Sequence, residues 1–353
     1  MPPAPNQDLA TVAQLAEFDE VIDVRTPSEF DEDRVPGAIN CPVLSDEERA
    51  RVGTLYKQVS TFSGRKLGAA LVSRNIARHI EESFFDKPKS WRPLVYCWRG
   101  GKRSDALVHI LREIGWDAQR LGGGYKAYRR TVVAELPELA RRYRLRVVCG
   151  LTGSGKSRLL ATLDRLGAQV LDLEKLAAHR GSVLGGLPLE PQPSQKMFES
   201  RLWFQLRGFD ARHPVFVESE SKRIGALHLP DELMASMWES ECVKLETNTA
   251  ARVDLLADEY AHFLADAAAL GLRLDMLLQM HGRAVIERWK EMAQQGQWND
   301  LVRELLERHY DPAYTRSIGS HYPKLAQART VAIASYTEEA FMTAARLTLE
   351  PGA

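Results

Sequence analysis

The strongest chemical signal in the sequence lies at residues 150–157. They read Gly-Leu-Thr-Gly-Ser-Gly-Lys-Ser, which matches the phosphate-binding pattern G-x-x-x-x-G-K-[ST] in full between a strand-like run and a helical one. Backbone N–H groups and the start of the next helix surround phosphate oxygens in such a loop, while Lys156 adds a positive charge and Ser157 can hold Mg²⁺. A chance glycine loop would not need the flanking strand and helix. The residues expected to bind phosphate are Gly150, Gly153, Ser154, Gly155, Lys156 and Ser157.

Two carboxylates are candidates to complete this phosphate site. Such a group usually holds the metal ion or its water molecules, and Asp172 and Glu218 each follow an apolar run. Glu218 follows Pro-Val-Phe-Val, whereas Asp172 is equally suited to cap the next helix. The segment 179–182, His-Arg-Gly-Ser, is either a further source of anion-binding groups or a solvated loop. We expect no resident metal site and no firmly bound cofactor, so Mg²⁺ would arrive with the phosphate.

A second chemical signal is Cys97, which ends the run Leu-Val-Tyr-Cys and begins the loop Cys-Trp-Arg-Gly-Gly-Lys-Arg-Ser. A thiol beside a helix start and near Arg99, Lys102 and Arg103 should have a lowered pKa and exist partly as the reactive thiolate. Apolar burial of a small side chain would not require two glycines and three cations next to it. We therefore expect Cys97, Arg99 and Arg103 to be catalytic.

The other three cysteines, Cys41, Cys149 and Cys242, lack such surroundings. Successive cysteines along the chain are 56, 52 and 93 residues apart, which fits neither a chelating pair nor a dense disulfide framework. We expect these three to be small buried apolar side chains, and the protein to reside in a reducing cytoplasm.

The elements that must position Cys97 begin with a short β-branched strand at 21–24 and a second strand at 94–97. A helix should follow the Cys97 loop and end at Gly115. Residues 45–90 are rich in charged residues and Ser, and should form helices on one side of the sheet. After a strand at 118–121 comes a basic helix that we expect Pro137 to end, with a domain boundary near 137–144.

The phosphate loop should be positioned by a second set of alternating strands and helices. Helices are expected to about 166, near 194–209, and again at 283–294 and 299–308, while strand signals vanish after 250. Alternation of this kind indicates a mostly parallel sheet with both faces covered. The strands are expected at 145–149, 169–173, 215–217 and 242–245.

Composition limits the class of protein more than it identifies a function. The 353 residues suit two or three domains, and 44% hydrophobic with 27% charged residues is a globular balance. Lys plus Arg and Asp plus Glu both total 47, so any nucleic-acid surface must be a local patch. The most apolar stretch, 260–280, carries charged residues, and the N-terminal residues do not form a signal peptide, so we expect neither membrane spanning nor secretion.

The segment 120–146 is the best local basic patch. It holds eight Lys or Arg residues against two Glu, and it lies at the expected domain boundary. It is either a nucleic-acid surface or an ordinary solvated helix and linker. The candidate contacts to nucleic-acid phosphates are Arg129, Arg130, Arg141 and Arg142. A second candidate surface is the helical region after 250, where cations alternate with rings at Arg303, Arg308, Tyr310, Tyr314 and Arg316.

Four segments in order resemble the signatures of a rhodanese domain. They are Asp-Val-Arg-Thr-Pro-Ser-Glu-Phe at 23–30, Arg-Val-Pro-Gly-Ala-Ile-Asn at 34–40, the Cys97 loop, and Leu-Gly-Gly-Gly-Tyr-Lys-Ala-Tyr at 121–128. The resemblance implies a cysteine that carries sulfur or selenium as a persulfide or perselenide. This sequence departs from the usual sulfurtransferase in its large insertion at 45–90 and in its loop. Five residues separate Cys97 from Arg103, one more than usual and as in related phosphatases.

The order of a rhodanese-like domain and a P-loop domain, with the segments at 96–104, 150–157, 173–182 and 217–221, resembles the tRNA 2-selenouridine synthase family over nearly the whole chain. This resemblance implies an α/β protein with a rhodanese-like domain at 1–137, a P-loop NTPase-like domain at 138–250 and its helical extension at 251–353. It implies a transferase that converts wobble 2-thiouridine of tRNA into 2-selenouridine with selenophosphate, through an S-geranyl intermediate made from geranyl diphosphate. The implied partners are tRNA and these two small substrates, and the expected state is a cytoplasmic monomer.

Two other functions fit part of the same residues. An ATP-dependent kinase with a regulatory rhodanese domain would use Lys156, Ser157 and Glu218. A phosphatase would use Arg103 to hold a phosphate dianion while Cys97 attacks phosphorus. The loop pattern by itself does not decide whether the phosphate site takes a nucleotide, a diphosphate or selenophosphate.

Overall fold

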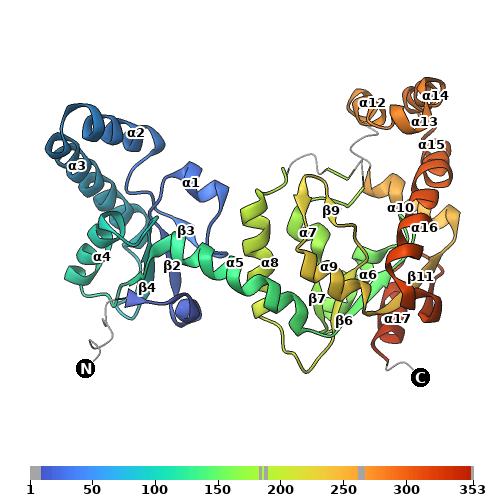
Figure 1. The fold of residues 1–353 in the computed structure, drawn as a ribbon, viewed down its shortest axis with the longest axis horizontal. Coiled ribbons are helices and arrows are strands. Elements are labelled where there is room, and N and C mark those ends of the chain that lie inside the picture. Colours follow the sequence, from blue (N-terminus) through green and yellow to red (C-terminus); the bar gives the residue numbers. More distant parts are fainter. Residues whose placement is uncertain (1–8, 183–184, 187–189, 261–266, 351–353) are drawn as a thin grey trace. The chain divides into compact units, whose positions relative to one another are not determined.

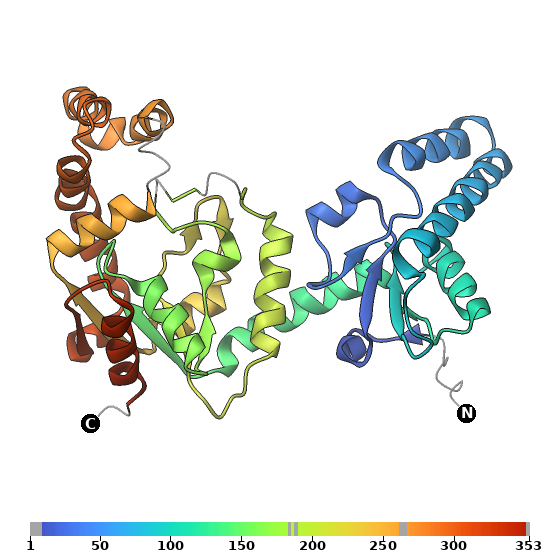
Figure 2. The ribbon, with the colours of Figure 1, turned by 180° about the vertical axis from the view of Figure 1, so that it is seen from behind.

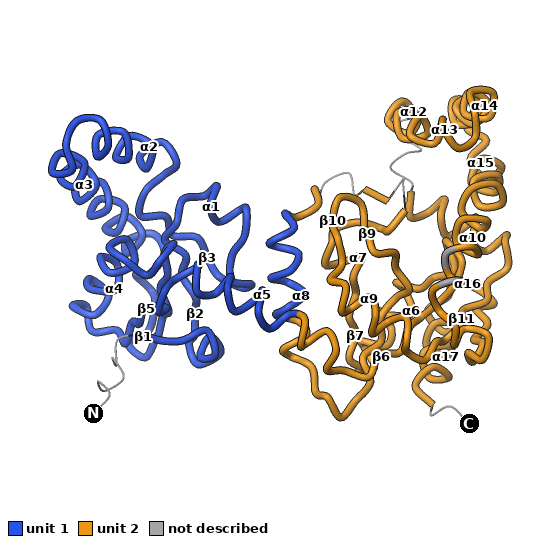
Figure 3. Tube along the Cα trace, in the orientation of Figure 1, with its two compact units in different colours: residues 1–136, 194–204 blue, residues 137–193, 205–353 orange. Residues whose placement is uncertain are grey.

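The fold is that of a computed structural model of the 353-residue chain, which describes residues 9–182, 185–186, 190–260 and 267–350. The chain forms two compact units. Unit 1 comprises residues 1–136 and 194–204, and unit 2 comprises residues 137–193 and 205–353 (Figure 3). Each unit contains one five-stranded parallel sheet, so the predicted fold class, two α/β domains with a helical C-terminal region, is confirmed.

Unit 1 places Cys97 at the end of its central strand. The strand order is β1-β5-β4-β2-β3, and each neighbouring pair is parallel. Parallel strands end at the same edge, so the residues that follow β2 and β4 come together there. The strands are β1 (Leu9–Ala10), β2 (Glu20–Asp23), β3 (Ile39–Asn40), β4 (Pro93–Tyr96) and β5 (Gln119–Leu121).

The insertion at 45–90 is helical, as the sequence predicts. Figures 1 and 2 show α2 and α3 as a pair of helices that extend beyond the sheet. Ser45 and Ser60 start these helices by accepting hydrogen bonds from the backbone N–H groups of Glu48 and Ser63. The helices that belong wholly to unit 1 are α1 (Pro27–Glu32), α2 (Asp46–Thr54), α3 (Thr61–His79) and α4 (Lys102–Ile114).

The expectation that Pro137 ends the basic helix is wrong, because α5 runs without interruption from Gly124 to Arg142. Proline lacks an N–H, so the carbonyl of Val133, four residues earlier, loses its usual helical donor. Val133 is 57% exposed, so this turn of the helix faces solvent. Both α5 and α8 (Gln195–Arg207) contain residues of both units.

The sheet of unit 2 has the order β12-β11-β6-β8-β7, with every neighbouring pair parallel. The expectation of no strand after residue 250 is wrong, since β12 pairs with β11 along the sheet edge. Only Val331 and Ile333 of β12 are buried, which makes its apolar pattern too short to stand out. The strands are β6 (Leu145–Cys149), β7 (Gln169–Leu171), β8 (Val215–Glu218), β11 (Glu241–Thr247) and β12 (Arg329–Ile333), and β9 (Arg223–Ile224) and β10 (Leu227–His228) form a separate hairpin.

Helices α6 and α17 share a buried core with one face of this sheet, and α9 packs near β6. The apolar stretch at 260–280 is not one long helix, and among the described residues no helix is long and apolar enough to cross a membrane. Further helices, α12 to α15, enclose a core of their own around Trp289. The helices of unit 2 are α6 (Lys156–Arg165), α7 (Leu173–Ala177), α9 (Asp231–Trp238), α10 (Thr249–Glu259), α12 (Ala267–Asp275), α13 (Leu278–His281), α14 (Arg283–Gln294), α15 (Trp298–Leu305), α16 (Asp311–His321) and α17 (Glu338–Leu349).

Candidate functional site

The phosphate loop joins β6 to α6 at the edge where the parallel strands of unit 2 end. Gly153 and Gly155 have φ angles of +75° and +86°, in the left-handed region that glycine tolerates. A Cβ on Gly155 would stand 2.7 Å from the ring of Phe341, so the loop also packs closely against α17. These two glycines are therefore required both for the turn and for the packing.

The carbonyl groups of the loop are held by side chains that the sequence analysis did not identify. Arg252 Nε donates to the carbonyl of Thr152 at 2.9 Å, and Tyr336 donates to the carbonyl of Gly153 at 2.5 Å. Thr247 donates to the carbonyl of Ser154 at 3.2 Å. Bonds of this kind fix which way each peptide unit faces, and so they shape the loop before any anion binds. Because these side chains come from β11, α10 and the chain beyond β12, no local pattern marks them.

Tyr314 of α16 also contacts the loop. Its hydroxyl accepts a hydrogen bond from the N–H of Gly150 at 2.5 Å, and the ammonium of Lys156 lies 5.7 Å from its ring centre. Lys156 donates to the carbonyl of Gly150 at 2.9 Å. The sequence analysis considered Tyr314 as an exposed ring for stacking on RNA bases, but the structure uses it to support the phosphate loop.

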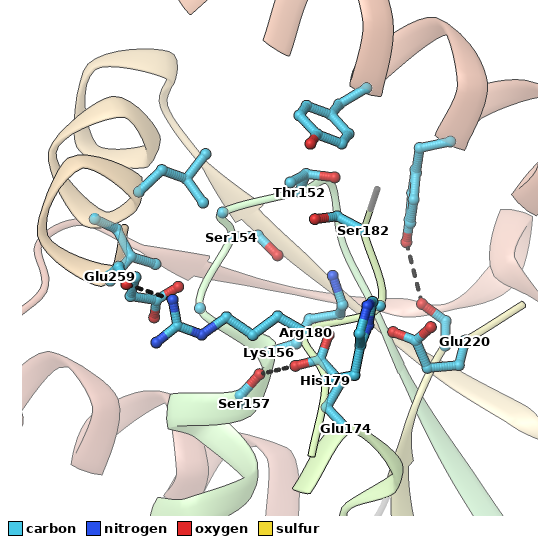
Figure 4. A pocket seen from close by; sticks show the side chains of 18 of the residues that line it. Thr152, Ser154, Lys156, Ser157, Glu174, His179, Arg180, Ser182, Glu220 and Glu259 are labelled. Carbon is cyan, nitrogen blue, oxygen red and sulfur yellow. Dashed lines mark hydrogen bonds between the residues drawn. The ribbon is translucent and has the colours of Figure 1, made fainter. Parts of the chain in front are cut away.

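A cavity of about 630 Å³ opens in front of the loop. The segment 179–182 lines it, which places His179, Arg180 and Ser182 beside Lys156 (Figure 4). The lining also contains the aliphatic residues Leu255, Leu256 and Ile318, which we call the apolar wall. Four tyrosines line the cavity as well, namely Tyr260, Tyr310, Tyr314 and Tyr322. Two of them contact polar groups of the site, since the hydroxyl of Tyr260 lies 3.2 Å from that of Ser182 and Tyr314 contacts the loop. The cavity therefore combines anion-binding groups with apolar ones.

The carboxylates that line the cavity are not the same pair as the one expected from the sequence, Asp172 and Glu218. Glu218, the favoured candidate, is 1% exposed and lies behind the cavity wall, where its Oε1 accepts from the N–H of Glu174 at 2.8 Å. Its Oε2 has no hydrogen-bond partner in the part of the chain that the structure describes. Glu174 and Glu220 line the cavity instead, and Glu174 accepts a hydrogen bond from Ser157 at 2.9 Å. Asp172 also lines the cavity while it caps α7 through the N–H of Lys175.

Burial and neighbouring carboxylates favour the neutral form of these acidic groups. Burial, together with the charge of Asp172, raises the pKa of Glu218 well above its ordinary value. Burial and the neighbouring Glu174 raise the pKa of Glu220 to about 8, and the two side chains share a hydrogen bond. Burial likewise raises the pKa of Asp172. The carboxyl groups beside Lys156 are thus compatible with an anionic ligand, because burial opposes their charged form.

The described residues contain no cluster of three or more His, Cys, Asp or Glu side chains that would by itself hold a metal ion. Mg²⁺ usually binds through one or two carboxylates and the oxygens of a bound phosphate. The hydrogen-bonded pair of Ser157 and Glu174 provides such oxygens beside the loop. These two residues fit an ion that arrives with its phosphate, and the ion would there neutralise charge on phosphate oxygens.

In unit 1, Cys97 follows β4 and lies at the start of α4, with only 4% of its surface exposed. Its sulfur accepts a hydrogen bond from the N–H of Gly101 at 3.2 Å and lies 3.2 Å from the hydroxyl of Ser104. Burial raises the pKa of the thiol, but these hydrogen bonds and the charge of Arg103 outweigh it, and the net pKa is lowered. The main anion-stabilising groups are therefore Ser104 and the helix start, and Ser104 was not singled out in the sequence analysis.

The two arginines of the Cys97 loop have different surroundings. Arg103 is mostly buried and forms an ion pair with Glu29 at 2.9 Å, so its guanidinium is held in place next to the thiol. Arg99 is exposed. A fixed Arg103 and a solvent-facing Arg99 are both available to a ligand that approaches the loop.

Backbone packing explains the glycines on either side of this loop. Gly100 and Gly124 have φ angles of +63° and +59°, and a Cβ on Gly124 would stand 2.2 Å from the carbonyl of Cys97. That same carbonyl accepts from the N–H of Tyr125 at 2.9 Å. Gly124 therefore packs directly against the Cys97 loop, whereas Gly123, also at a positive φ, lies close to Ala127 of the following helix.

The basic residues at 120–146 do not all face solvent. Arg120 donates to the carbonyl of Gly100 at 2.8 Å and pairs with Asp105, so it supports the Cys97 loop. Arg129 forms ion pairs with Glu199 and Asp33, and its side chain is 18% exposed. The exposed candidates for nucleic-acid contact are Arg130, Arg141 and Arg142.

The remaining cysteines are buried in the structure. Burial raises the pKa of Cys41 to about 12. A hydrogen bond with Cys242, followed by burial, raises the pKa of Cys149. At neutral pH both are therefore thiols rather than thiolates, in contrast with Cys97.

A parallel sheet that ends in a thiolate loop and a second one that ends in a phosphate loop define a two-domain protein, a rhodanese-like domain joined to a P-loop domain. Comparison with family models agrees: residues 8–131 match the Rhodanese-like domain, and residues 143–269 match the tRNA 2-selenouridine synthase AAA domain. The chain belongs to the tRNA 2-selenouridine synthase family.

Proteins named tRNA 2-selenouridine synthase are similar over most of the chain. The protein from Nitrosomonas europaea is 39% identical, with 68% of this chain aligned to 63% of that protein. The protein from Sulfurovum sp. is 34% identical over 84% of this chain and 88% of its own length. The protein from Salmonella typhi is 35% identical over 83% of this chain and 87% of its own length.

Proposed function

We propose that this chain is a tRNA 2-selenouridine synthase that replaces the sulfur of wobble 2-thiouridine by selenium, through an S-geranyl intermediate. The observation that carries the proposal is the pairing of a lowered-pKa cysteine in one domain with a phosphate cavity that has an apolar wall in the other. The similarity to proteins of that name supports the tRNA substrate. Geranyl diphosphate and selenophosphate are the substrates that the resemblance to this family implies, and the chemistry of the two loops is compatible with them.

The phosphate cavity suits the first half of the reaction. The sulfur of 2-thiouridine attacks C1 of the geranyl group, the C1–O bond breaks, the diphosphate leaves with the bonding electrons, and the N3 proton of the base is released. Lys156 and the loop N–H groups would stabilise the charge that develops on the departing diphosphate. The apolar wall beside Leu255 would hold the hydrocarbon part.

The Cys97 loop suits the second half, in which the selenium of selenophosphate attacks C2 of the base, the C2–S bond breaks and geranylthiol leaves with a proton, and water then cleaves the P–Se bond and releases phosphate. Cys97 would assist selenium transfer or the departure of the sulfur, and either role would draw on a thiol with a lowered pKa. Ser104, the N–H of Gly101 and Arg103 support such a role, because they lower the pKa of Cys97. Selenophosphate, as a small anion, also suits the positive surroundings of this loop.

The test is reconstitution with purified protein and an anticodon stem-loop that contains 2-thiouridine. With geranyl diphosphate alone, mass spectrometry of the nucleosides should show S-geranyl-2-thiouridine, and addition of selenophosphate should convert it into 2-selenouridine. Two results would contradict this proposal, and each would favour a different function. Rapid ATP hydrolysis without either product would favour a kinase, and release of phosphate from an aryl phosphate would favour a phosphatase.

The tRNA part of the proposal has its own test. Replacement of Arg130, Arg141 and Arg142 by Ala should lower tRNA affinity and reduce the salt dependence of binding by about one counterion for each lost phosphate contact. Arg129→Ala serves as a comparison, because the ion pairs of Arg129 predict a loss of stability instead. An unchanged salt slope in the triple variant would place the tRNA surface elsewhere.

A further inference from the structure

A second, smaller cavity lies beside the phosphate cavity. It has a volume of about 50 Å³ and lies between α10 and α15. Among the residues that the structure describes, its lining contains no charged side chain. The residues that line it are Thr152, Leu256, Ala257, Tyr260, Leu270, Trp298, Leu301, Val302, Leu305 and Tyr310.

The two cavities are neighbours through shared walls. Thr152 belongs to the phosphate loop itself, and Leu256, Tyr260 and Tyr310 line both cavities. Leu256, Tyr260 and Tyr310 therefore stand between the two spaces, and a ligand with its phosphates on the loop would reach the smaller space along these side chains. That end must be apolar, because a polar group placed among these side chains would lose its hydrogen bonds to water.

The smaller cavity is also part of a rigid core. Leu270, Leu301 and Leu305 are 4%, 1% and 5% exposed, and they pack around the fully buried Trp289. Interiors of this density do not expand freely to accept a larger group. One water molecule needs about 10–15 Å³ of cavity volume, so this cavity has room for roughly three to five small atoms or groups of that size. That space matches the end of a short hydrocarbon chain.

We propose that this cavity is the subsite for the distal end of the substrate's hydrocarbon chain, and that Ala257 and Leu301 set the chain length the enzyme accepts. The inference rests on the proposed function, because it assumes a prenyl diphosphate on the phosphate loop. The first five-carbon unit lies along Leu256 and Tyr260 in the larger cavity, and the second unit enters the smaller one. A third unit meets the packed side of Leu301.

The experiment compares dimethylallyl, geranyl and farnesyl diphosphate, with five, ten and fifteen carbons, as donors to the thiouridine stem-loop. The wild-type protein should prefer the ten-carbon donor. Ala257→Leu fills the cavity and should raise KM for geranyl diphosphate roughly 30-fold, with little change for dimethylallyl diphosphate, since the lost contacts involve about five carbon atoms. Leu301→Ala enlarges the cavity and should raise the use of farnesyl diphosphate about tenfold.

Two controls separate the subsite from general damage. Leu272→Ala is a matched control, because Leu272 is 74% exposed on α12 and lies outside the cavity. Binding of inorganic pyrophosphate, measured by calorimetry, should be unchanged in all variants. Ala257→Leu keeps the test valid even where Leu301→Ala fails to fold.

The outcomes distinguish this inference from the proposed function. Unchanged chain-length preference in Ala257→Leu, with intact pyrophosphate binding, would overturn the subsite while leaving the transferase activity in place. If ATP binding, and not geranyl diphosphate binding, responded to Ala257→Leu, the occupant would be a nucleotide and the inference would also fail. No geranyl transfer by the wild-type protein would instead refute the proposed function.

Discussion

The Cys97 loop and the phosphate loop differ in how far along the sequence their supporting residues lie. The Cys97 loop is supported by residues near it in the sequence, mainly Ser104, Gly101 and the glycines at 122–124. The phosphate loop has its glycine pattern in eight consecutive residues, but its shape depends on Arg252, Tyr314 and Tyr336. A short motif can therefore identify a site whose supporting residues lie up to 183 positions away.

The largest expected effect comes from Cys97→Ser, which should abolish selenium incorporation while leaving geranylation intact. An alcohol is not ionised at neutral pH and is neither a ready nucleophile nor a selenium carrier. Mass spectrometry of both nucleoside products measures the two steps separately. In the control Cys41→Ala, both products should form, with a lower melting temperature from the lost packing. Full 2-selenouridine formation by Cys97→Ser would contradict the assignment of the thiol.

Lys156→Ala should produce the converse pattern in the other loop. Loss of the ammonium should weaken geranyl diphosphate binding and slow geranyl transfer by about 100-fold, the usual cost of one preorganised charge-stabilising group. Conversion of an already geranylated stem-loop should proceed at the wild-type rate. Lys222→Ala provides the matched control, since Lys222 is exposed and lies outside the cavity. An equal loss in both steps would show that the two loops do not act separately.

The raised pKa of Glu220 predicts a pH effect confined to the phosphate loop. Below about pH 8 the side chain is neutral, and above it the carboxylate adds negative charge beside the ligand. Affinity for geranyl diphosphate should therefore fall about tenfold from pH 7 to pH 9, a range in which the diphosphate itself no longer titrates. Glu220→Gln should flatten this profile. A fall of the same size in the Gln variant would assign the effect to another group.

Ser104→Ala tests the smaller contribution to the thiolate. Without the hydroxyl, the pKa of Cys97 should rise, and alkylation of this thiol by iodoacetamide at pH 7 should slow by about threefold to tenfold. The rate profile should move to higher pH, which a purely structural role of Ser104 would not produce. Ser73→Ala, at an exposed serine of α3, is the control. If the rate profile did not move, the N–H of Gly101 and the charge of Arg103 would be sufficient to lower the pKa of Cys97.

The sequence predicted what local patterns encode. Both loops, the strands that precede them and the helical insertion follow from glycine spacing, β-branched runs and apolar periodicity. Three features were not predicted from the sequence, each for a physical reason. The helix continues through Pro137 at an exposed turn, where the missing N–H removes only one helical hydrogen bond. Strand β12 is an edge strand with only two buried side chains. Glu218 is the last residue of β8 and is not part of the cavity lining, whereas Glu220, two residues later, lines the cavity.

The support of the phosphate loop by Tyr336 has a consequence for the order of events on the ribosome. At about 5–20 residues per second, Tyr336 is added roughly 10–40 seconds after the loop has been made. During that interval the nascent chain carries the complete motif without the hydroxyl that holds the carbonyl of Gly153. The phosphate loop therefore acquires its final shape only after Tyr336 has been added, when the Cys97 loop and its partners Gly101 and Ser104 have long since left the ribosome.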